Sequence, residues 1–450
     1  MKLQIKTLSP IHIGNGEKYN GLSYVEDIFS TPKRVFVMNF DRIKTILNQK
    51  DLQSFMDWVV SEKYPSWFKF CKSELNKPQL LNEFKKVAIY TLNNYSAERN
   101  LRDIDCFIKQ NNRPYIPGTE IKGAIRTAIA YHLLGSNENY VWLKKQLLEL
   151  QNKFRNTFLI LSSCGRKGNS YLSISELKQI QKEELKRLFG EKRLNEITKK
   201  IRHEEYPKIR INDIKNIFIK EVGKIEENLQ NKLFRVNNNS DAKYDLLKVF
   251  QVGDSELKDP FQCLFVSSMK VENTKKRDTQ GNLTDIILFQ ELCTQDQIFT
   301  CQFSQLENNR TNRTVLDKLG FTPEQKWVVS DIENVFQCCY QFTDRLLREE
   351  IDYFTNLNKP QIITMLHSIK HQNTPTSPAI RIGKNEGYFS ITMGLLVKDK
   401  DKTLYDNILC HATKNTSYTG NFPKTRRVVN LLNNKQDTLG WVKLIVENEK

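Results

Sequence analysis

The sequence predicts an α+β fold with mainly antiparallel sheets. Strand-like stretches come first along the chain, long helical blocks separate them, and no βαβαβ cadence is present. Hydrophobic residues make up 39% of the chain and charged residues 27%, which is typical of a folded, water-soluble protein. With 450 residues, the chain is long enough for roughly two to three domains with cores of their own.

The first hundred residues are expected to form strands and then helices. Residues 2–7 alternate apolar and polar side chains, which predicts a half-buried strand. Asp41 is expected to cap a short helix that ends at Leu47. The expected elements are strands over residues 2–7, 23–28 and 34–39, a helix over 41–47, and further helices over 51–95.

Residues 114–127 (PYIPGTEIKGAIRT) predict a tight turn followed by a helix over 119–134. Gly118 and the prolines fix the turn, and Thr119 is expected to be the N-cap. Lys122 and Arg126 lie one turn apart, so together with the free amides of the helix start they could form a phosphate-binding corner. A plain helix start with two solvated cations accounts for this stretch equally well.

Beyond this helix, we expect helices to residue 235 and then mainly strands. Residues 140–161 and the densely charged residues 174–235 are expected to form solvated helices, and residues 237–240 a loop near a domain seam at 245. Residues 298–303 are expected to pair with 286–292 as a hairpin. The other expected elements are strands over 249–252, 264–272, 285–292, 388–392 and 441–446, and helices over 323–354 and 360–369.

The charge of the chain favours a polyanionic partner. The formal net charge is +17 and the pI is near 9.3, and nucleic acid is the commonest polyanion that such a surface binds. Because the excess charge is spread along the chain, ordinary solubility charge is the alternative.

The nine cysteines form no C-x-x-C pair, which fits neither a zinc ribbon nor a disulfide framework. His367 and His371 lie four residues apart, but the H-E-x-x-H pattern is absent and no third ligand is evident. We therefore expect no metal and no cofactor. No apolar run approaches membrane length, so we expect a cytoplasmic protein without a membrane partner.

Four glycine-rich or basic places could contact RNA. Glycines let a sugar-phosphate chain approach the backbone closely, a histidine can stack on a base, and basic residues beside aromatic rings offer both phosphate contacts and stacking faces. Each place also has a structural explanation: His12 could be a structural histidine, the loop around Gly383 an ordinary hairpin turn, and the basic cluster near residue 424, which also contains Lys414, a solvated tail. The candidate residues are His12, Gly14 and Gly16; Gly118, Thr119, Lys122 and Arg126; Arg381, Gly383, Lys384 and Gly387; and Lys424, Arg426 and Arg427, near Tyr418 and Phe422.

Four stretches resemble, in the expected order, motifs of the RAMP proteins of CRISPR systems. Thr119-Glu120 departs from that pattern, because two small hydroxyl residues are expected there, and residues 140–245 show no such likeness. The matching stretches are residues 8–16 (LSPIHIGNG), 114–127, 380–390 (IRIGKNEGYFS), and 422–427 (FPKTRR) followed by 439–442 (LGWV).

The resemblance implies two ferredoxin-like (RRM-like) domains. The first would cover residues 1–245, with helical insertions at about 41–100 and 140–235, and the second residues 246–450, with the glycine-rich loop 382–394. The tail resembles that of the family member that caps the type III-A Csm effector complex. The implied function is a non-catalytic subunit that binds the 3′ part of the CRISPR RNA (crRNA) and supports crRNA maturation and antiviral defence.

The implied partners are the crRNA, the repeating backbone RAMP subunit and the small helical subunit, with target RNA and recruited cellular nucleases as further candidates. The alternative is a metal-independent endoribonuclease that processes precursor crRNA. Some relatives cut RNA with a histidine or aspartate near the first strand, where His12 and Asp27 lie in this chain. No acid/base pair is evident around either residue, so we expect no enzyme and assign no catalytic residue.

Overall fold

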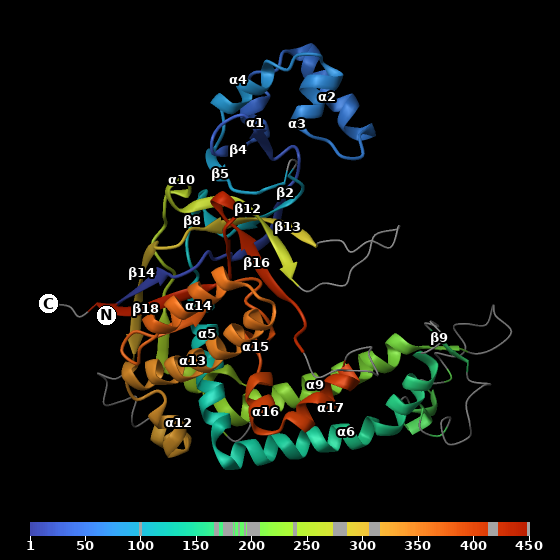
Figure 1. Cartoon of the computed structure of the whole chain (residues 1–450), viewed down its shortest axis with the longest axis vertical. Helices are drawn as coiled ribbons and strands as arrows, with labels where there is room; N and C mark the ends of the chain where they lie inside the picture. Colours follow the sequence, from blue (N-terminus) through green and yellow to red (C-terminus); the bar gives the residue numbers. More distant parts are fainter. Residues whose placement is uncertain are drawn as a thin grey trace.

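Two β-sheets form the centre of the protein, and helices cover them or project from them (Figure 1). The fold comes from a computed structural model. The described residues are 1–98, 101–165, 171–173, 183, 185–187, 190–192, 195, 208–236, 241–272, 286–305, 316–412 and 422–447. The fold is a mixed α+β fold, as the sequence predicts.

The first sheet has five strands, and all neighbouring strands are antiparallel. In spatial order they are β11 (Phe250–Val252), β14 (Ile298–Gln305), β1 (Lys2–Thr7), β18 (Trp441–Glu447) and β15 (Ala379–Arg381). The alternating pattern of β1 places Leu3 and Ile5 in the core, where both are fully buried. The predicted strands 2–7 and 441–446 therefore lie side by side at the centre of this sheet.

The second sheet has nine strands and is mostly antiparallel; β12 pairs with β5, and β13 with β6, in parallel. Its main path is β2 (Gly14–Tyr19), β6 (Ile104–Phe107), β13 (Ile287–Cys293), β12 (Leu264–Glu272), β5 (Tyr90–Asn94), β4 (Lys33–Val37) and β3 (Tyr24–Asp27). A branch adds β16 (Arg426–Asn430), which pairs with β12, and β17 (Gln436–Asp437). Two small ribbons pair β7 (Lys109–Gln110) with β8 (Arg113–Pro114), and β9 (Tyr171–Ser173) with β10 (Lys208–Arg210).

Two long helices, α5 (Gly118–Gly135) and α13 (Ile332–Asn356), lie against the five-stranded sheet, and α14 (Pro360–Gln372) packs on α13 and contacts β17. Their apolar stripes and the inner face of the sheet form the main core. On α13, for example, Val335, Phe342 and Leu346 recur at helical spacing and are buried. This packing fixes the start of α5 next to the sheet.

A small helical unit, made by residues 40–86, stands at the top of Figure 1 beside β3 and β4. It contains α1 (Phe40–Ile43), α2 (Gln49–Ser61), α3 (Trp67–Lys69), a π-helical turn (Phe70–Glu74) and α4 (Leu80–Lys86). Its core is separate from the main one and centres on Trp67, whose ring lies 4.9 Å from that of Phe55. The unit lies within the region, about residues 41–100, for which the sequence predicts a helical insertion.

A helical arm extends from the opposite end of the molecule (Figure 1). It combines α6 (Asn137–Gly165), α9 (Ile211–Phe234) and α17 (Lys402–Ala412), which α16 (Gly394–Lys400) joins to the main body. Short elements complete the description: α10 (Pro260–Cys263), α12 (Pro323–Trp327), α15 (Tyr388–Ile391), and 3-10 turns at Ala242–Tyr244, Leu246–Val249 and Leu432–Asn434. Among the described residues, no helix combines the length and the apolar character needed to cross a bilayer.

The predicted hairpin between residues 286–292 and 298–303 is wrong. Strand β13 belongs to the nine-stranded sheet and β14 to the five-stranded sheet, where β14 pairs with β1 and β11. The intervening residues serve as a crossover, because Cys293 bridges to Ile11 and the amide of Asp296 donates to the carbonyl of Thr7. Contacts with distant segments outweigh the local turn signal.

Four local predictions also need correction. Asn39, not Asp41, caps α1, and residues 90–94 form strand β5 rather than a helix. The predicted helix over 323–354 is divided into α12 and α13, because Asp331 caps a new helix start. The stretch 388–391 is the short helix α15, not a strand. The predicted loop 237–240 lies outside the described residues.

The two sheets do not divide at residue 245. Strand β1 pairs with β14 and β18, β5 pairs with β12, and β6 pairs with β13, so each sheet combines strands from both sides of that residue. The division of the chain into two domains at 245 stays a prediction, and any such domains share strands.

Candidate nucleic-acid interface

Three of the four candidate stretches meet at one open hollow. Its walls come from three segments: the connection from β1 into β2, the first turn of α5, and the glycine-rich loop after β15. Its volume is about 340 Å³, and its lining residues are Ile13, Gly14, Gly16, Glu120, Gly383, Lys384 and Glu386. Residues that are hundreds of positions apart in the sequence therefore form one surface.

Hydrogen bonds to the glycine-rich loop hold these segments together. The amide of Lys384 donates to the carbonyl of His12 at 2.8 Å, and the amide of Gly383 donates to Glu120 Oε2 at 3.1 Å. Gly383 has a φ of 87°, and a Cβ atom there would lie 2.4 Å from the carbonyl oxygen of His12. Only glycine fits this position, because both the backbone conformation and the available space exclude a side chain.

His12 lies under the hollow rather than in it. The ring is buried, its edge faces Phe107, and Nδ1 donates to the carbonyl of Glu291 at 2.7 Å. Burial lowers the pKa of His12 to about 4, so the imidazole is neutral at physiological pH. The predicted stacking of this ring on a base is therefore not supported. Its Nε2 is buried and has no hydrogen-bond partner among the described residues.

Gly14 makes this placement possible, since a Cβ atom on it would lie 3.1 Å from His12 Nε2. The first two glycine positions thus differ in role: Gly14 leaves room for the histidine, and Gly16, with a φ of 89°, shapes the open rim.

Two lysines carry the positive charge of the site: Lys384 lines the hollow, and Lys18 shares an acidic partner with Lys384. Lys384 Nζ donates to Asp105 Oδ2 at 2.7 Å, and Lys18 Nζ lies 3.3 Å from Asp105 Oδ1. Burial alone would raise the pKa of Asp105, but hydrogen bonds from Lys384 and Gln290 outweigh it and leave that pKa below its ordinary value. Half of each lysine side chain is exposed, so both ammonium groups can also reach a phosphate.

Sequence reasoning missed Lys18 and Asp105. Lys18 follows the Gly-Asn-Gly turn on the same strand, which could have indicated it. Asp105 comes from β6, and only the pairing of β6 with β2 brings it beside Lys18.

Two glutamates line the hollow as well. Burial raises the pKa of Glu386 to about 8; the charge of Arg381 opposes this shift, and that of Glu120 adds to it. Glu386 is therefore mostly protonated at neutral pH, which makes the hollow less acidic than its composition suggests.

The predicted phosphate-binding corner on α5 is filled by groups of the protein itself. Pro117, not Thr119, holds the N-cap position, and the amide of Gly118 donates to Asp254 Oδ1 at 2.9 Å. Lys122 Nζ donates to the carbonyl of Phe250 at 2.9 Å. Thr119 is exposed and directly precedes Glu120, which lines the hollow.

Arg126 is held in the same way. Its guanidinium pairs with Asp245 at 3.0 Å and lies 3.9 Å from the centre of the Phe234 ring. Because the partners come from residues 230–254, far along the chain, the local sequence did not reveal them. We no longer expect Lys122 and Arg126 to be primary phosphate contacts.

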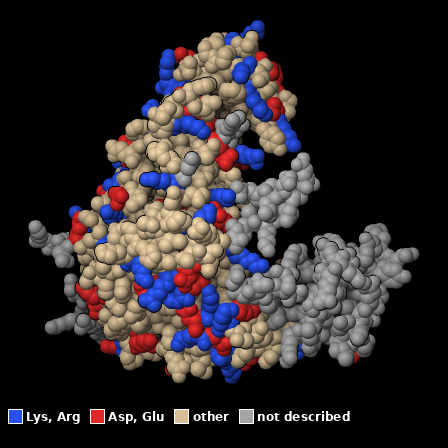
Figure 2. Space-filling model, in the orientation of Figure 1, with Lys and Arg blue, Asp and Glu red and all other residues tan. Residues whose placement is uncertain are grey.

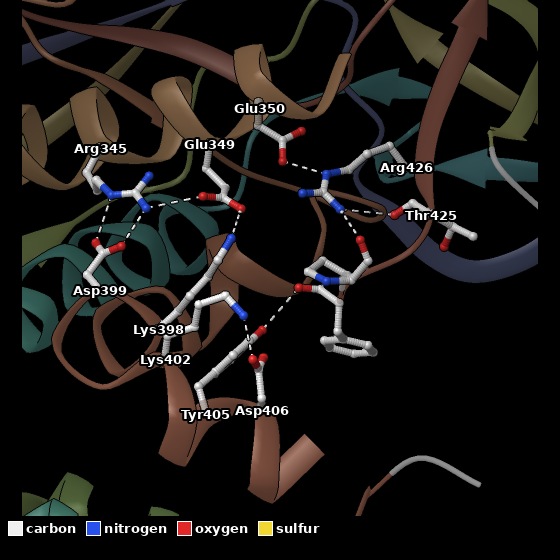
Figure 3. Close-up of polar contacts among 12 residues, drawn as sticks. Arg345, Glu349, Glu350, Lys398, Asp399, Lys402, Tyr405, Asp406, Thr425 and Arg426 are labelled. Atoms are coloured by element: carbon white, nitrogen blue, oxygen red, sulfur yellow. Dashed lines mark hydrogen bonds and ion pairs between the residues drawn. The ribbon is translucent and has the colours of Figure 1, made fainter. Parts of the chain in front are cut away.

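Charges of both signs interleave on the face below the sheets (Figure 2), and ion pairs between α13 and α16 contribute to this pattern. Figure 3 shows these contacts: Arg345 pairs with Asp399 and Glu349, and Glu349 also pairs with Lys398. They connect the arm to the main body.

Glu350, on the next position of α13, pairs with two buried arginines. Its Oε1 accepts from Arg426 Nε at 2.6 Å (Figure 3), and its Oε2 accepts from Arg381 Nη1 at 3.4 Å. Arg381 also lies over Trp441, and Arg426 over Tyr353. All three charged side chains are at least 95% buried. We therefore correct both arginines from RNA contacts to structural residues.

The neighbouring candidates differ. Arg427 points outward from β16 and is exposed, since alternate residues of a strand face opposite sides. Lys424 is half-buried, and its carbonyl accepts a hydrogen bond from Tyr353. Gly387, with a φ of 92°, starts the turn into α15. Lys414 and Tyr418 lie outside the described residues.

A buried polar network supports the hollow from below. The carboxylate of Glu291 is fully buried and pairs with Lys109, and it accepts hydrogen bonds from the amide of Phe107 and the hydroxyl of Tyr90. The carbonyl of the same residue holds His12. Over the described part of the chain, no group of three or more His, Cys, Asp or Glu side chains is arranged to hold a metal ion.

A comparison with models of protein families identifies the family of this chain. The profile of the RAMP superfamily matches residues 4–262, which is more than half of the chain. The chain belongs to the RAMP superfamily.

Two curated RAMP relatives are similar to part of the chain. Both are described as "CRISPR system Cms protein Csm5". The protein from Streptococcus thermophilus is 26% identical over 144 residues, which cover 28% of this chain and 37% of the relative. The one from Methanocaldococcus jannaschii is 27% identical over 139 residues, which cover 30% of this chain and 32% of the relative. The matches thus span about a third of the curated relatives' length.

Solved structures extend the likeness of fold to the whole RAMP chain. One chain of the cryo-EM structure of a Csm-crRNA-target RNA ternary complex of a type III-A CRISPR-Cas system has a TM-score of 0.60 and 18% identity, covering 99% of this chain and all of that one. The crystal structure of T. onnurineus Csm5 has a TM-score of 0.57 and 17% identity, covering 98% of this chain and all of that one. At this identity the likeness shows the shared fold.

Proposed function

We propose that this protein is a non-catalytic crRNA-binding RAMP subunit of a type III-A CRISPR Csm complex. It caps the complex at the 3′ side of the crRNA and supports crRNA maturation and antiviral defence in the cytoplasm. Its partners are the crRNA, the repeating backbone RAMP subunit and the small helical subunit. Target RNA and recruited nucleases are further candidates.

The observation that carries this proposal is the hollow beside Gly14, Gly16, Gly383 and Lys384. The three glycines of its lining expose backbone without side chains, Lys384 supplies an ammonium group there, and Lys18 shares the partner Asp105 with Lys384. A sugar-phosphate chain needs close backbone approach and exposed cations, not a deep apolar pocket. The net charge of +17 adds long-range attraction for RNA.

The place in the complex rests on similarity. The relatives' description names a CRISPR system, and one structure with this fold is a chain of a complex that contains crRNA and target RNA. We also propose that each sheet derives from one ferredoxin-like (RRM-like) module and that the modules exchanged strands. The five-stranded sheet with α5 and α13 on one face supports this for the first module.

The alternative function, metal-independent cleavage of precursor crRNA, has less support. A general base must reach the 2′-hydroxyl, and its pKa should lie near the working pH. His12 is buried with a pKa of about 4, and Asp27 is paired with Lys85 at 3.1 Å. Incubation of the purified protein with repeat RNA in EDTA tests this alternative, and we expect intact RNA.

Replacement of Lys18 and Lys384 together tests the proposed site. Lys18→Gln with Lys384→Gln should weaken binding of labelled crRNA, because each lysine that contacts a phosphate releases counterions on binding. The slope of log affinity against log salt should become shallower by about 0.7 for each lost contact. Fluorescence anisotropy over a salt series measures both quantities.

A second double variant, Lys402→Gln with Lys326→Gln, is the matched control. These lysines also pair with carboxylates, Asp406 and Asp317, but lie on α17 and α12. The control removes the same net charge and should leave the slope near the wild-type value. Equal losses in the two double variants would show that only net charge matters and would reject the hollow as the binding site.

A further inference from the structure

The small helical unit carries a surface of apolar side chains and lysines that its own core does not use. We call it the aromatic patch and define it as Met56, Val60, Lys63, Tyr64, Phe68 and Lys72. Val60 is 88% exposed, Tyr64 67%, Phe68 59% and Met56 47%. The adjacent aromatic residues Phe55, Trp67, Phe70 and Phe84, by contrast, are buried in the core of the unit.

Each exposed ring has an ammonium group close to it. Lys63 Nζ lies 5.2 Å from the centre of the Tyr64 ring, and Lys72 Nζ lies 5.2 Å from that of Phe68. Lys69 Nζ lies 5.9 Å from the Tyr64 ring. Aromatic rings and positive charge therefore alternate along the patch.

The segment that presents Tyr64 is held in place. Its amide donates to Glu62 Oε1 at 3.0 Å, and Lys69 Nζ donates both to Glu62 Oε1 and to the carbonyl of Tyr64 at 3.0 Å. The chain then enters α3, where Ser66 caps the helix and Trp67 is buried. Because the backbone around Tyr64 is already held, binding of a partner to the exposed ring should cost little backbone conformational entropy.

The chemistry of the patch fits single-stranded RNA better than a protein. The buried centres of protein interfaces are depleted in lysine, whereas here lysines alternate with the rings. Exposed aromatic faces beside cations are the arrangement with which proteins hold unpaired bases and their phosphates. Lys and Arg side chains outline the upper unit in Figure 2, and residues 40–88 contain nine of them against six acidic residues.

We propose that the aromatic patch is a second contact for single-stranded RNA, separate from the hollow. Tyr64 and Phe68 stack on unpaired bases, and Lys63 and Lys72 neutralise the adjoining phosphates. The guide RNA and a target RNA share this chemistry. The inference stands on the patch alone and does not depend on the proposed role of the hollow.

The test compares two short labelled strands on the full-length protein, an oligoadenylate and an abasic strand of equal length. The experiment uses the Lys18→Gln, Lys384→Gln background, so that binding at the hollow does not mask the patch. Tyr64→Ala with Phe68→Ala should weaken binding of the oligoadenylate by about 5-fold or more for each stacked base lost. Binding of the abasic strand should change little, because it offers no base to stack.

Phe261→Ala is the matched control, since Phe261 on α10 is 56% exposed, close to the value for Phe68. It should not affect either strand. Lys63→Gln with Lys72→Gln should weaken both strands and flatten the salt dependence. Unchanged oligoadenylate binding in the ring variant, or equal losses with both strands, would overturn the proposal. If only assembly with other protein subunits were lost, the patch would belong to a protein interface.

Discussion

His12 makes the stability of the folded chain depend on pH. Its pKa in the folded protein is about 4, below the ordinary value of 6.5, because burial disfavours the imidazolium. Above pH 6.5 the ring is neutral in both states and its full contribution to stability is present. As the pH falls from 6.5 towards 4, the unfolded chain takes up a proton that the folded chain does not, and stability is lost.

We therefore expect the free energy of unfolding to fall by about 1.4 kcal/mol per pH unit below pH 6 from this residue alone. Glu386 acts in the opposite direction, because its raised pKa of about 8 means that stability is lost as the pH rises from its ordinary value of 4.5 through 8. The contribution of His12 is thus the difference between the wild type and His12→Gln, measured by urea unfolding from pH 7 to pH 5.

His371→Gln, which removes an exposed imidazole from α14, is the control and should parallel the wild type. If the free energy of unfolding changed with pH in the same way in the wild type and in His12→Gln, His12 would take up its proton equally well in the folded and the unfolded chain. That result would contradict the prediction.

Single residues show where sequence reasoning succeeds. The sequence predicts Gly383 and Lys384 in a glycine-rich loop, and the structure places both at the hollow. Their contact with RNA stays a prediction. The partners of Arg126, Arg381 and Arg426 lie far along the chain, at Asp245 and Glu350. The sequence alone therefore cannot show whether a basic residue is free to bind a phosphate or is already paired with an acidic residue that lies far along the chain.

At the level of elements, α13 acts as a tie between two strands of different sheets. Through Glu350 it holds Arg381, at the end of β15, and Arg426, at the start of β16. Glu350→Gln would leave two buried guanidinium groups without a carboxylate, and loss of one partner from a buried ion pair costs about 3–5 kcal/mol. We expect a loss of that order in urea-induced unfolding.

Asp344→Asn on the same helix is the control. Asp344 pairs with Arg348 one turn away, and that arginine is 60% exposed, so the change should cost about 1 kcal/mol or less. If Glu350→Gln were as stable as Asp344→Asn, the ion pairs of Glu350 with Arg381 and Arg426 would contribute little to stability, which would contradict the prediction.

Elements with strong local signals were predicted well: strand β1, helix α5 after its Pro-Gly turn, and helix α14 after Pro360. Strand β5 was missed because residues 90–94 are a short segment directly after a helical block and gain their place by pairing with β4 and β12. The β13–β14 connection was misread for the same reason: a turn signal fixes a change of direction but not the sheet to which the next strand adds.

For the whole molecule, the exchange of strands predicts that the two halves do not fold alone. Residues 1–245 lack both partners of β1 and one partner each of β5 and β6. Residues 246–450 lack one partner each of β12, β13, β14 and β18. We expect each fragment to be insoluble or unfolded when produced separately, and co-expression to restore a folded pair. Circular dichroism and size-exclusion chromatography distinguish these states. A fragment 246–450 that unfolds cooperatively by itself would instead support independent domains that meet at residue 245.

The central position of β1 also governs how the chain folds during synthesis. Strand β1 is synthesised long before its neighbour β18 (Trp441–Glu447), because ribosomes add only about 5–20 residues per second. Strand β1, with Leu3 and Ile5, therefore waits roughly 20–90 s with at least one edge unpaired. A nascent chain with this topology is exposed to aggregation or chaperone capture until β18 has been synthesised, so any pause in translation before β18 prolongs that exposure.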